Sequence, residues 1–305
     1  MQNSDYHIPV MLEEALHGLS IRPDGTYVDV TFGGGGHSRA ILERLDSEGR
    51  LLAFDQDTDA IANTLEDSRF TLINENFRYL RSFLRLQGVR NVDGILADLG
   101  VSSHQFDVAE RGFSTRLDGE LDLRMDRRNE VSGREVVNSL SEDDLARLLK
   151  LYGELPNARQ MAKAIVKARG EKAIVTTSDL KEAVSRHLPR GMENKYLAML
   201  FQALRIEVNG ELEALKEMLQ QACEVLVPGG RLVVISYHSL EDRLVKNFMR
   251  GGNFEGEVEK DFYGNVLSPM RMVSHGAVQA SEEEVLRNNR ARSARLRVAE
   301  KVMVK

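Results

Sequence analysis

Residues 29–38 read DVTFGGGGHS, and this stretch decides the fold. It joins an apolar run over 27–32, expected as a strand, to a helical pattern over 38–45. Four consecutive glycines allow the backbone to approach a ligand closely at the helix N-terminus. In an open α/β sheet this is the edge at which nucleotides bind. The stretch therefore predicts a nucleotide-binding turn, although a glycine turn can also serve only tight packing of a strand on a helix.

The chain around this turn alternates short apolar runs with helical patterns. The further strands are expected at 51–55, 70–74 and 92–98, and the helices between them at 59–65 and 77–86. Such alternation predicts a parallel sheet with right-handed crossovers.

The pattern changes after Gly100. An irregular segment rich in Arg, Asp and Gly comes first, and only helices are expected over 141–204. Strands return at 231–237, 270–274 and 294–302. The fold class is therefore α/β, an open sheet with an all-helical domain inserted after the fourth strand. We expect the sheet domain at 1–103 and 206–305, and the inserted domain at 104–205.

Acidic residues stand at the ends of the expected strands. Asp55 ends the second strand, about 20 residues beyond the glycines, where an acid can accept hydrogen bonds from both hydroxyls of a ribose. Asp29 precedes the glycines, where an acid can meet a cationic amino-acid group. Asp98 ends the fourth strand, where enzymes that methylate exocyclic amines place a polar group beside the methyl donor. Together these acids favour a nucleotide site over a packing turn.

Composition narrows the class further. Hydrophobic residues make up 42% and charged residues 29%, as in soluble globular proteins. No apolar run approaches the ~18 residues of a membrane helix, and no secretory signal is visible. The single cysteine, Cys223, fits a reducing compartment. We expect a cytoplasmic protein, monomeric or homodimeric, with no membrane partner, and no metal site because the histidines are scattered and the cysteine is alone.

Charge leaves two interpretations open. A net charge of −6 argues mildly against nucleic acid, yet residues 287–305 carry seven cations against one acid, Glu300. A second group of arginines follows the fourth strand, around Phe113, and consists of Arg111, Arg116, Arg124, Arg127 and Arg128. Both groups could contact phosphates. The alternatives are a solvated face for the tail, and pairing of the arginines with the interleaved Asp118, Asp122 and Asp126.

At this point the motifs match one family in order. The matching segments are 7–12, 31–38, 98–103, 109–114, 118–126, 201–212, 228–243 and 290–299. The strings DLGVSS at 98–103 and HSLEDR at 238–243 are the most specific. On these segments the chain resembles, over nearly its whole length, the bacterial small-subunit (16S) ribosomal RNA cytosine-N4 methyltransferases of the MraW type.

The resemblance implies a class I (Rossmann-like) methyltransferase sheet that uses S-adenosylmethionine, with the inserted domain recognising the substrate. It implies methyl transfer to N4 of a cytidine in the decoding-centre region of 16S ribosomal RNA. By resemblance, the residues that line the cofactor are Gly35, Gly36, His37, Asp55, Phe77, Asp98 and Gln105. The chain departs from the family pattern in loops, at His104, Glu120, Asn289 and 274–278. These departures leave local loop geometry open.

The exocyclic amine of cytosine is a poor nucleophile, so the enzyme must orient it and accept its proton. Asp98 is the candidate catalytic residue, although it could instead contact only the cofactor. His238 and His37 are more simply interpreted as structural, and Ser102 and Ser103 as turn residues. Three rival functions remain: an NAD-dependent oxidoreductase, a non-catalytic RNA-binding factor and a small-molecule methyltransferase.

Overall fold

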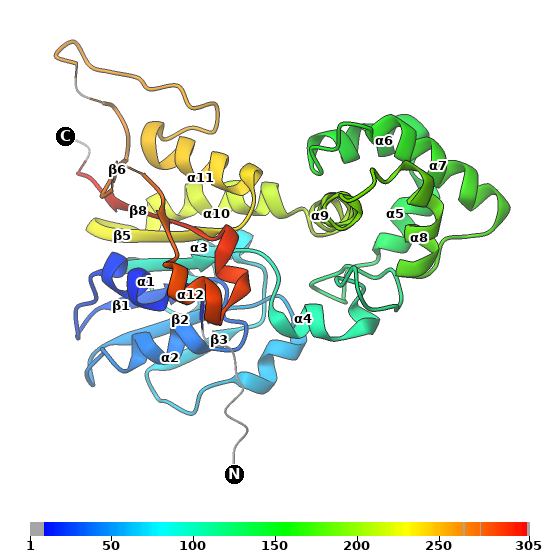
Figure 1. The fold of residues 1–305 in the computed structure, drawn as a ribbon. Helices are drawn as coiled ribbons and strands as arrows, with labels where there is room; N and C mark the ends of the chain where they lie inside the picture. The colour runs from blue at the N-terminus through cyan, green and yellow to red at the C-terminus, as the bar shows by residue number, and fades with distance from the viewer. Residues whose placement is uncertain (1–8, 265, 275, 304–305) are drawn as a thin grey trace. The chain divides into compact units, whose positions relative to one another are not determined.

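The computed structural model describes residues 9–264, 266–274 and 276–303, and the chain divides into two compact units (Figure 1). The first unit comprises residues 1–100 and 212–305, and the second comprises residues 101–211. Within the sequence segments singled out above, residues 7, 8, 275, 304 and 305 lie outside the described residues.

A mixed sheet forms the centre of the first unit and, within the described residues, has eight strands (Figure 1). The strand order is β3-β2-β1-β4-β5-β8-β6, with β7 also paired to β8. Neighbours among β1 to β5 are parallel, whereas β8 is antiparallel to β5, β6 and β7. The strands are β1 (Thr26–Asp29), β2 (Arg50–Phe54), β3 (Phe70–Ile73), β4 (Val92–Asp98), β5 (Leu226–Ser236), β6 (Met270–Met272), β7 (Val278–Gln279) and β8 (Arg295–Lys301). The predicted α/β class is confirmed.

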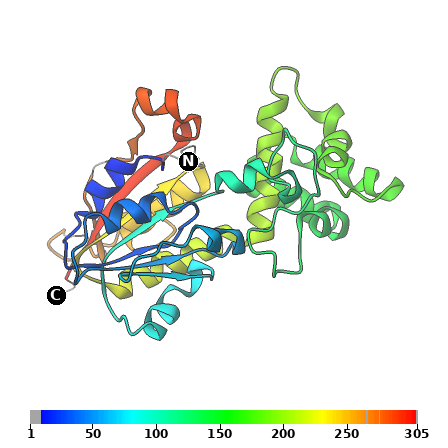
Figure 2. The same ribbon diagram turned by 90° about the horizontal axis from the view of Figure 1, so that it is seen from below.

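Helices cover both faces of this sheet (Figures 1 and 2). On one face lie α1 (Leu12–Leu19), α2 (Gly36–Leu42), α12 (Glu282–Arg287) and the 3₁₀ helix η5 (Asn289–Ser293). On the other lie α3 (Leu80–Leu86), α10 (Glu211–Val225) and α11 (Ser239–Gly251). Two short 3₁₀ helices, η1 (Thr58–Asn63) and η2 (Phe77–Tyr79), occupy loops. The α-helix expected over 59–65 is therefore the 3₁₀ helix η1.

Alternate side chains along each strand pack into two separate layers of the core, one on each face of the sheet. In β2, Leu52 and Phe54 pack in the cluster that includes α10 and α11, whereas Leu51 and Ala53 pack in the cluster that includes α1 and α2. Successive side chains of a strand point to opposite faces, so a strand buried on both faces is apolar throughout. The continuous apolar runs in the sequence arise in this way.

The second unit, which follows β4 as the pattern predicts, is mainly helical (Figure 1). Its helices are α4 (Ser103–Asp107), α5 (Gly133–Ser139), α6 (Glu142–Leu151), α7 (Ala158–Glu171), α8 (Thr177–Val184) and α9 (Glu193–Asn209), with short 3₁₀ helices at Ala109–Arg111 and Ser185–His187. Side-chain caps at Ser132, Ser141 and Thr176 begin α5, α6 and α8. Buried residues such as Leu149, Ile165 and Leu200 join these helices in one core.

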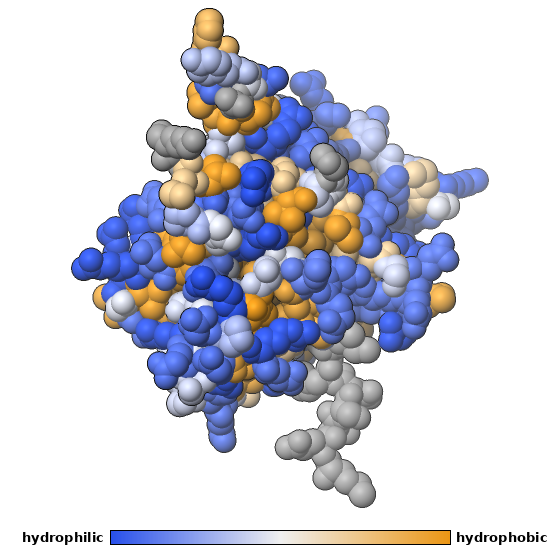
Figure 3. Space-filling model, turned by 90° about the vertical axis from the view of Figure 1, so that its left-hand side faces the viewer, coloured by the Kyte–Doolittle hydropathy of each residue, from blue (hydrophilic) through white to orange (hydrophobic). Residues whose placement is uncertain are grey.

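The surface is largely polar on the face drawn in Figure 3, where apolar side chains gather only in small, separate patches. Among the described residues, none of the helices combines the length and apolarity that crossing a bilayer would require.

One buried ion pair ties β8 to α11. Asp242 accepts hydrogen bonds from Arg297 at 2.7 and 3.0 Å, and from Arg295 at 3.2 Å. The side chains of Asp242 and Arg297 are only 10% and 8% exposed. Burial alone would raise the pKa of Asp242, but the two arginines outweigh it and hold that pKa below its usual value. The basic tail is thus partly an internal structural element.

We expect Asp242→Ala to lower the free energy of unfolding by about 3 kcal/mol, because it leaves the Arg297 guanidinium buried without its partner. Urea denaturation at pH 7 measures the change. Because the pKa of Asp242 is lowered in the fold, the contribution of the pair is present at neutral pH and is lost as the pH falls below about 4. The exposed pair of Arg44 with Glu13 provides the control, and Arg44→Gln should change stability by less than about 1 kcal/mol. Equal effects of the two variants would contradict this assignment.

Candidate active site

Three carboxylates meet at one edge of the sheet. Asp29 is the last residue of β1, Asp55 directly follows β2, and Asp98 is the last residue of β4. Since β1 pairs with β2 on one side and β4 on the other, the three side chains follow neighbouring strands. This is the edge that the glycine turn predicts for a ligand.

The glycine loop between β1 and α2 requires glycine at particular positions. Gly33 and Gly35 have φ values of +52° and +75°, which side chains with a Cβ rarely adopt. A Cβ on Gly36, the first residue of α2, would lie 2.5 Å from Cγ of Pro9. The loop is therefore held close both to the segment before α1 and to the sheet edge.

Asp55 anchors this loop to β2. Its Oδ2 accepts a hydrogen bond from the backbone N–H of Gly33 at 2.7 Å, and its Oδ1 accepts from the N–H of Asp57 at 2.8 Å. Burial raises the pKa of Asp55 to about 7, although these two hydrogen bonds oppose the rise. Each carboxylate oxygen has two lone pairs, so both oxygens keep acceptor capacity for a ligand.

Asp29 is bound from within the protein. It is only 1% exposed, and it accepts hydrogen bonds from the Ser38 hydroxyl at 2.7 Å and from the Thr31 N–H at 3.0 Å. Burial raises the pKa of Asp29, while nearby His37 and the hydrogen bond from Ser38 oppose the rise. Through these hydrogen bonds, Asp29 stabilises the glycine loop against the sheet. Contact of Asp29 with a cationic ligand group, which the sequence suggested, stays a prediction.

Asp98 lies between two polar side chains. The Tyr237 hydroxyl donates to Oδ1 at 2.6 Å, and Nδ1 of His37 lies 3.8 Å from Oδ2. Burial raises the pKa of Asp98 to about 6, against the opposing effects of His37 and Tyr237. The side chain is still 22% exposed, so the carboxylate remains partly accessible to a substrate group.

His37 is fixed by the main chain. Its Nε2 lies 3.1 Å from the carbonyl oxygen of Val10, and because a carbonyl can only accept, Nε2 carries the proton. With a side chain only 7% exposed, His37 is a fixed, buried part of this sheet edge.

Tyr237, which follows β5, is a site residue that the sequence did not reveal. Its N–H donates to Oε2 of Glu241 at 3.0 Å, so the residue joins Asp98 to the first turn of α11. Burial raises the pKa of Tyr237 well above its usual value, and the adjacent Asp98 adds to the rise. The hydroxyl is therefore a permanent donor at neutral pH.

His238 begins α11. Its Nδ1 accepts from the N–H of Glu241 at 3.4 Å, and its Nε2 lies 3.1 Å from Oε1 of the same residue. His238 is thus the N-cap of α11, since the imidazole can accept at the third helical amide. This geometry agrees with a structural role for His238.

Of the remaining predicted cofactor residues, Phe77 shares the sheet edge with Asp55. Asn74 joins the two loops, because its Nδ2 donates to the carbonyl of Asp55 at 2.8 Å. Gln105 lies in the second unit, where it forms a capping box with Ser102 at the start of α4. Ser102 therefore stabilises a turn, as the sequence favoured.

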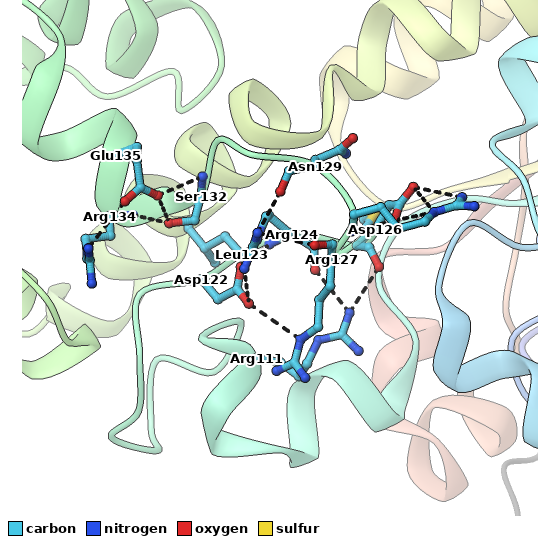
Figure 4. Close-up of polar contacts among 12 residues, drawn as sticks. Arg111, Asp122, Leu123, Arg124, Asp126, Arg127, Asn129, Ser132, Arg134 and Glu135 are labelled. Carbon is cyan, nitrogen blue, oxygen red and sulfur yellow. Dashed lines mark hydrogen bonds and ion pairs between the residues drawn. The ribbon is translucent and has the colours of Figure 1, made fainter.

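The arginines after β4 form an internal network in the second unit (Figure 4). Arg111 is 1% exposed and donates to the carbonyls of Arg124 and Met125 at 3.0 and 3.1 Å. Asp122 pairs with Arg124 at 2.6 Å and Arg127 at 3.6 Å, and Asp126 pairs with Arg128 at 2.9 Å. A hollow of about 240 Å³ beside them is lined in part by two ion pairs, Asp122 with Arg124 and Arg134 with Glu135. These contacts fit the interpretation of internal pairing for four of the five arginines, whereas Arg116 is exposed.

Comparison with known proteins gives a consistent result. The model of the MraW methylase family matches residues 4–302. The ribosomal RNA small subunit methyltransferase H of Flavobacterium johnsoniae is 58% identical over 298 residues, which cover 98% of each chain. The protein of that name from Phocaeicola vulgatus is 58% identical over 296 residues, or 97% of each chain. Among solved structures, an rRNA methylase from Streptococcus thermophilus aligns with a TM-score of 0.44 at 12% identity, covering 97% of this chain and 99% of that one.

We expect Tyr237→Phe to raise the pKa of Asp98 by about one unit, because a hydrogen bond that stabilises the carboxylate is lost. Carboxyl-detected NMR titration of the protein measures this shift. Tyr79→Phe, at a 49% exposed tyrosine in η2, is the control and should leave the Asp98 titration unchanged. An unchanged pKa in Tyr237→Phe would show that the hydrogen bond does not form in solution.

Proposed function

Because the chain belongs to the MraW methylase family, we propose that it transfers a methyl group from S-adenosylmethionine to N4 of a cytidine in 16S ribosomal RNA. The decoding-centre region of the small subunit is the proposed location of that cytidine. A ribosomal substrate implies a cytoplasmic enzyme. The observation that supports this chemistry best is the partly exposed Asp98 carboxylate, held by Tyr237 beside the glycine loop.

The residues at the sheet edge fit the cofactor. Gly33 and Gly35 adopt the positive φ values that this turn requires, and the space beside Gly33 is open, so a ligand can approach the backbone there. Asp55 offers lone pairs to the ribose hydroxyls, and Phe77, the first residue of η2, offers an apolar ring that is partly buried against the core. When bound, S-adenosylmethionine supplies an electrophilic methyl group on a sulfonium. The residues named at this edge include no pair of side chains suited to assist a hydride transfer, which disfavours the oxidoreductase alternative.

Asp98 would act on the amine. Its Oδ1 is engaged by Tyr237, so Oδ2 is the oxygen that accepts a hydrogen bond from the N4 amino group. This contact turns the nitrogen lone pair toward the methyl group and out of conjugation with the ring. Oδ2 would also take the proton that the amine must lose when it is methylated. The carboxylate is ionised above about pH 6, so activity should fall below that pH.

Methyl transfer from labelled S-adenosylmethionine to small ribosomal subunits, followed by nucleoside mass analysis, tests the function. We expect the label in N4-methylcytidine.

We also expect Asp55→Ala to weaken cofactor binding at least 10-fold in calorimetry, because the variant loses the acceptor for the ribose hydroxyls and releases Gly33. Cofactor binding without transfer to any ribosomal RNA would favour an assembly factor. Absence of cofactor binding by the wild-type protein would overturn the proposal.

Asp98→Asn separates the two roles that the sequence left open. If Asp98 orients the amine and takes its proton, kcat falls at least about 10²-fold while the affinity for S-adenosylmethionine changes little. If Asp98 contacts only the cofactor, calorimetry shows the main loss in affinity. We expect the first result. In Tyr237→Phe, the acid limb of the pH–rate profile should move upward together with the pKa of Asp98.

A further inference from the structure

The outer face of α7 carries cations that the second unit does not neutralise. Arg159, Lys163 and Lys167 are all exposed, and their spacing of four residues places them in one stripe, about 6 Å apart along the helix. The opposite face of α7 is buried in the helical core through residues such as Met161 and Ile165. We call these three cations the α7 ridge.

The α7 ridge differs from those cations of this unit that are already ion-paired. Arg124, Arg128, Arg147 and Lys172 each have a carboxylate within 3.1 Å. Across the part of the chain that the structure describes, the α7 ridge has no carboxylate within ion-pair distance. A paired arginine must give up its partner to bind a phosphate, whereas the α7 ridge can bind one at no such cost.

The surrounding segment reinforces this charge. Residues 155–195 contain nine cations and four acids, a net +5 in a chain of net −6. The Asn157 side chain donates to the carbonyl of His187 at 2.8 Å, which places the loop with exposed Arg186 and Arg190 at the N-terminal end of α7. Three acids of the segment, Glu171, Glu182 and Glu193, are exposed, and they leave the excess positive.

We propose that the α7 ridge binds the phosphate backbone of the RNA substrate, an inference that rests on the proposed function. Each lysine or arginine that neutralises a phosphate releases a condensed counterion, so such a surface gives sequence-independent affinity that weakens with salt. Four of the arginines after β4 that the sequence offered for this role, Arg111, Arg124, Arg127 and Arg128, have partners within the unit, which favours α7 as the phosphate-binding surface.

The test compares wild type with R159Q/K163Q/K167Q in binding to protein-free 16S ribosomal RNA and to small subunits over a series of KCl concentrations. The slope of log K against log [KCl] should fall in magnitude by about 2 to 3, because each phosphate contact contributes about 0.7–0.9. KM for the subunit should rise, with kcat and S-adenosylmethionine affinity unchanged. The charge-conserving variant R159K/K163R/K167R should keep the wild-type slope.

The matched control is R44Q/R81Q/R147Q, which removes the same charge from three exposed arginines that are already ion-paired. Its slope should remain near that of wild type. A wild-type slope in the α7 variant, or an equal loss in the control, would overturn the inference. Lost binding to subunits with unchanged binding to free RNA would also overturn it and assign the ridge to a protein partner. Failure of wild type to methylate ribosomal RNA contradicts the proposed function instead, because the binding slopes are measured independently.

Discussion

The removal of three carboxylates from water at neighbouring strand ends, nearly complete for Asp29 and partial for Asp55 and Asp98, is the constraint on which the first unit depends. An ionised carboxylate removed from water is strongly destabilising unless hydrogen-bond donors replace its hydration. The donors come from three different places: the Ser38 hydroxyl on α2, the Gly33 amide in the loop and the Tyr237 hydroxyl after β5. The glycine loop must therefore lie tightly against the sheet edge, and only residues without a Cβ can make that approach. Loop, strand and helix positions are set together by this requirement.

The three acids nevertheless differ in their access to solvent. This difference distinguishes the acid that holds the loop in place from the acid proposed to act on the substrate. Asp29 is only 1% exposed, whereas the side chain of Asp98 is 22% exposed. Tyr237 makes the separation possible, because it bonds Asp98 through its hydroxyl and Glu241 through its amide. The corner between β5 and α11 thus contributes to the orientation of a carboxylate on β4.

Patterns that depend on near neighbours could be predicted from the sequence, whereas pairings across long separations could not. The strands around Leu52 and Ile95 follow from apolar runs, and the place of Asp55 follows from its distance to the glycines. Tyr237 could not be found, because its partner Asp98 is 139 residues away and a lone tyrosine after a strand has no periodic signal. For the same reason the tail arginines were ambiguous: only the fold shows that Arg297 is buried on Asp242. The cap at His238 was missed because imidazole is a less common capping group than the adjacent serine.

The position of β8 within the sheet has a consequence for how the protein is made. Among the described strands, β8 is the last to leave the ribosome, yet it pairs with β5, β6 and β7. Until it arrives, a nascent chain has β5 as an open edge with unpaired backbone groups, which is the kind of edge that recruits other strands and aggregates. The contacts between β5 and β8 join residues that are far apart in the sequence. Because such contacts form slowly, we expect the completion of the sheet to be slow. The helical unit is one continuous segment, residues 101–211, so its whole sequence is available to fold while this edge is still open.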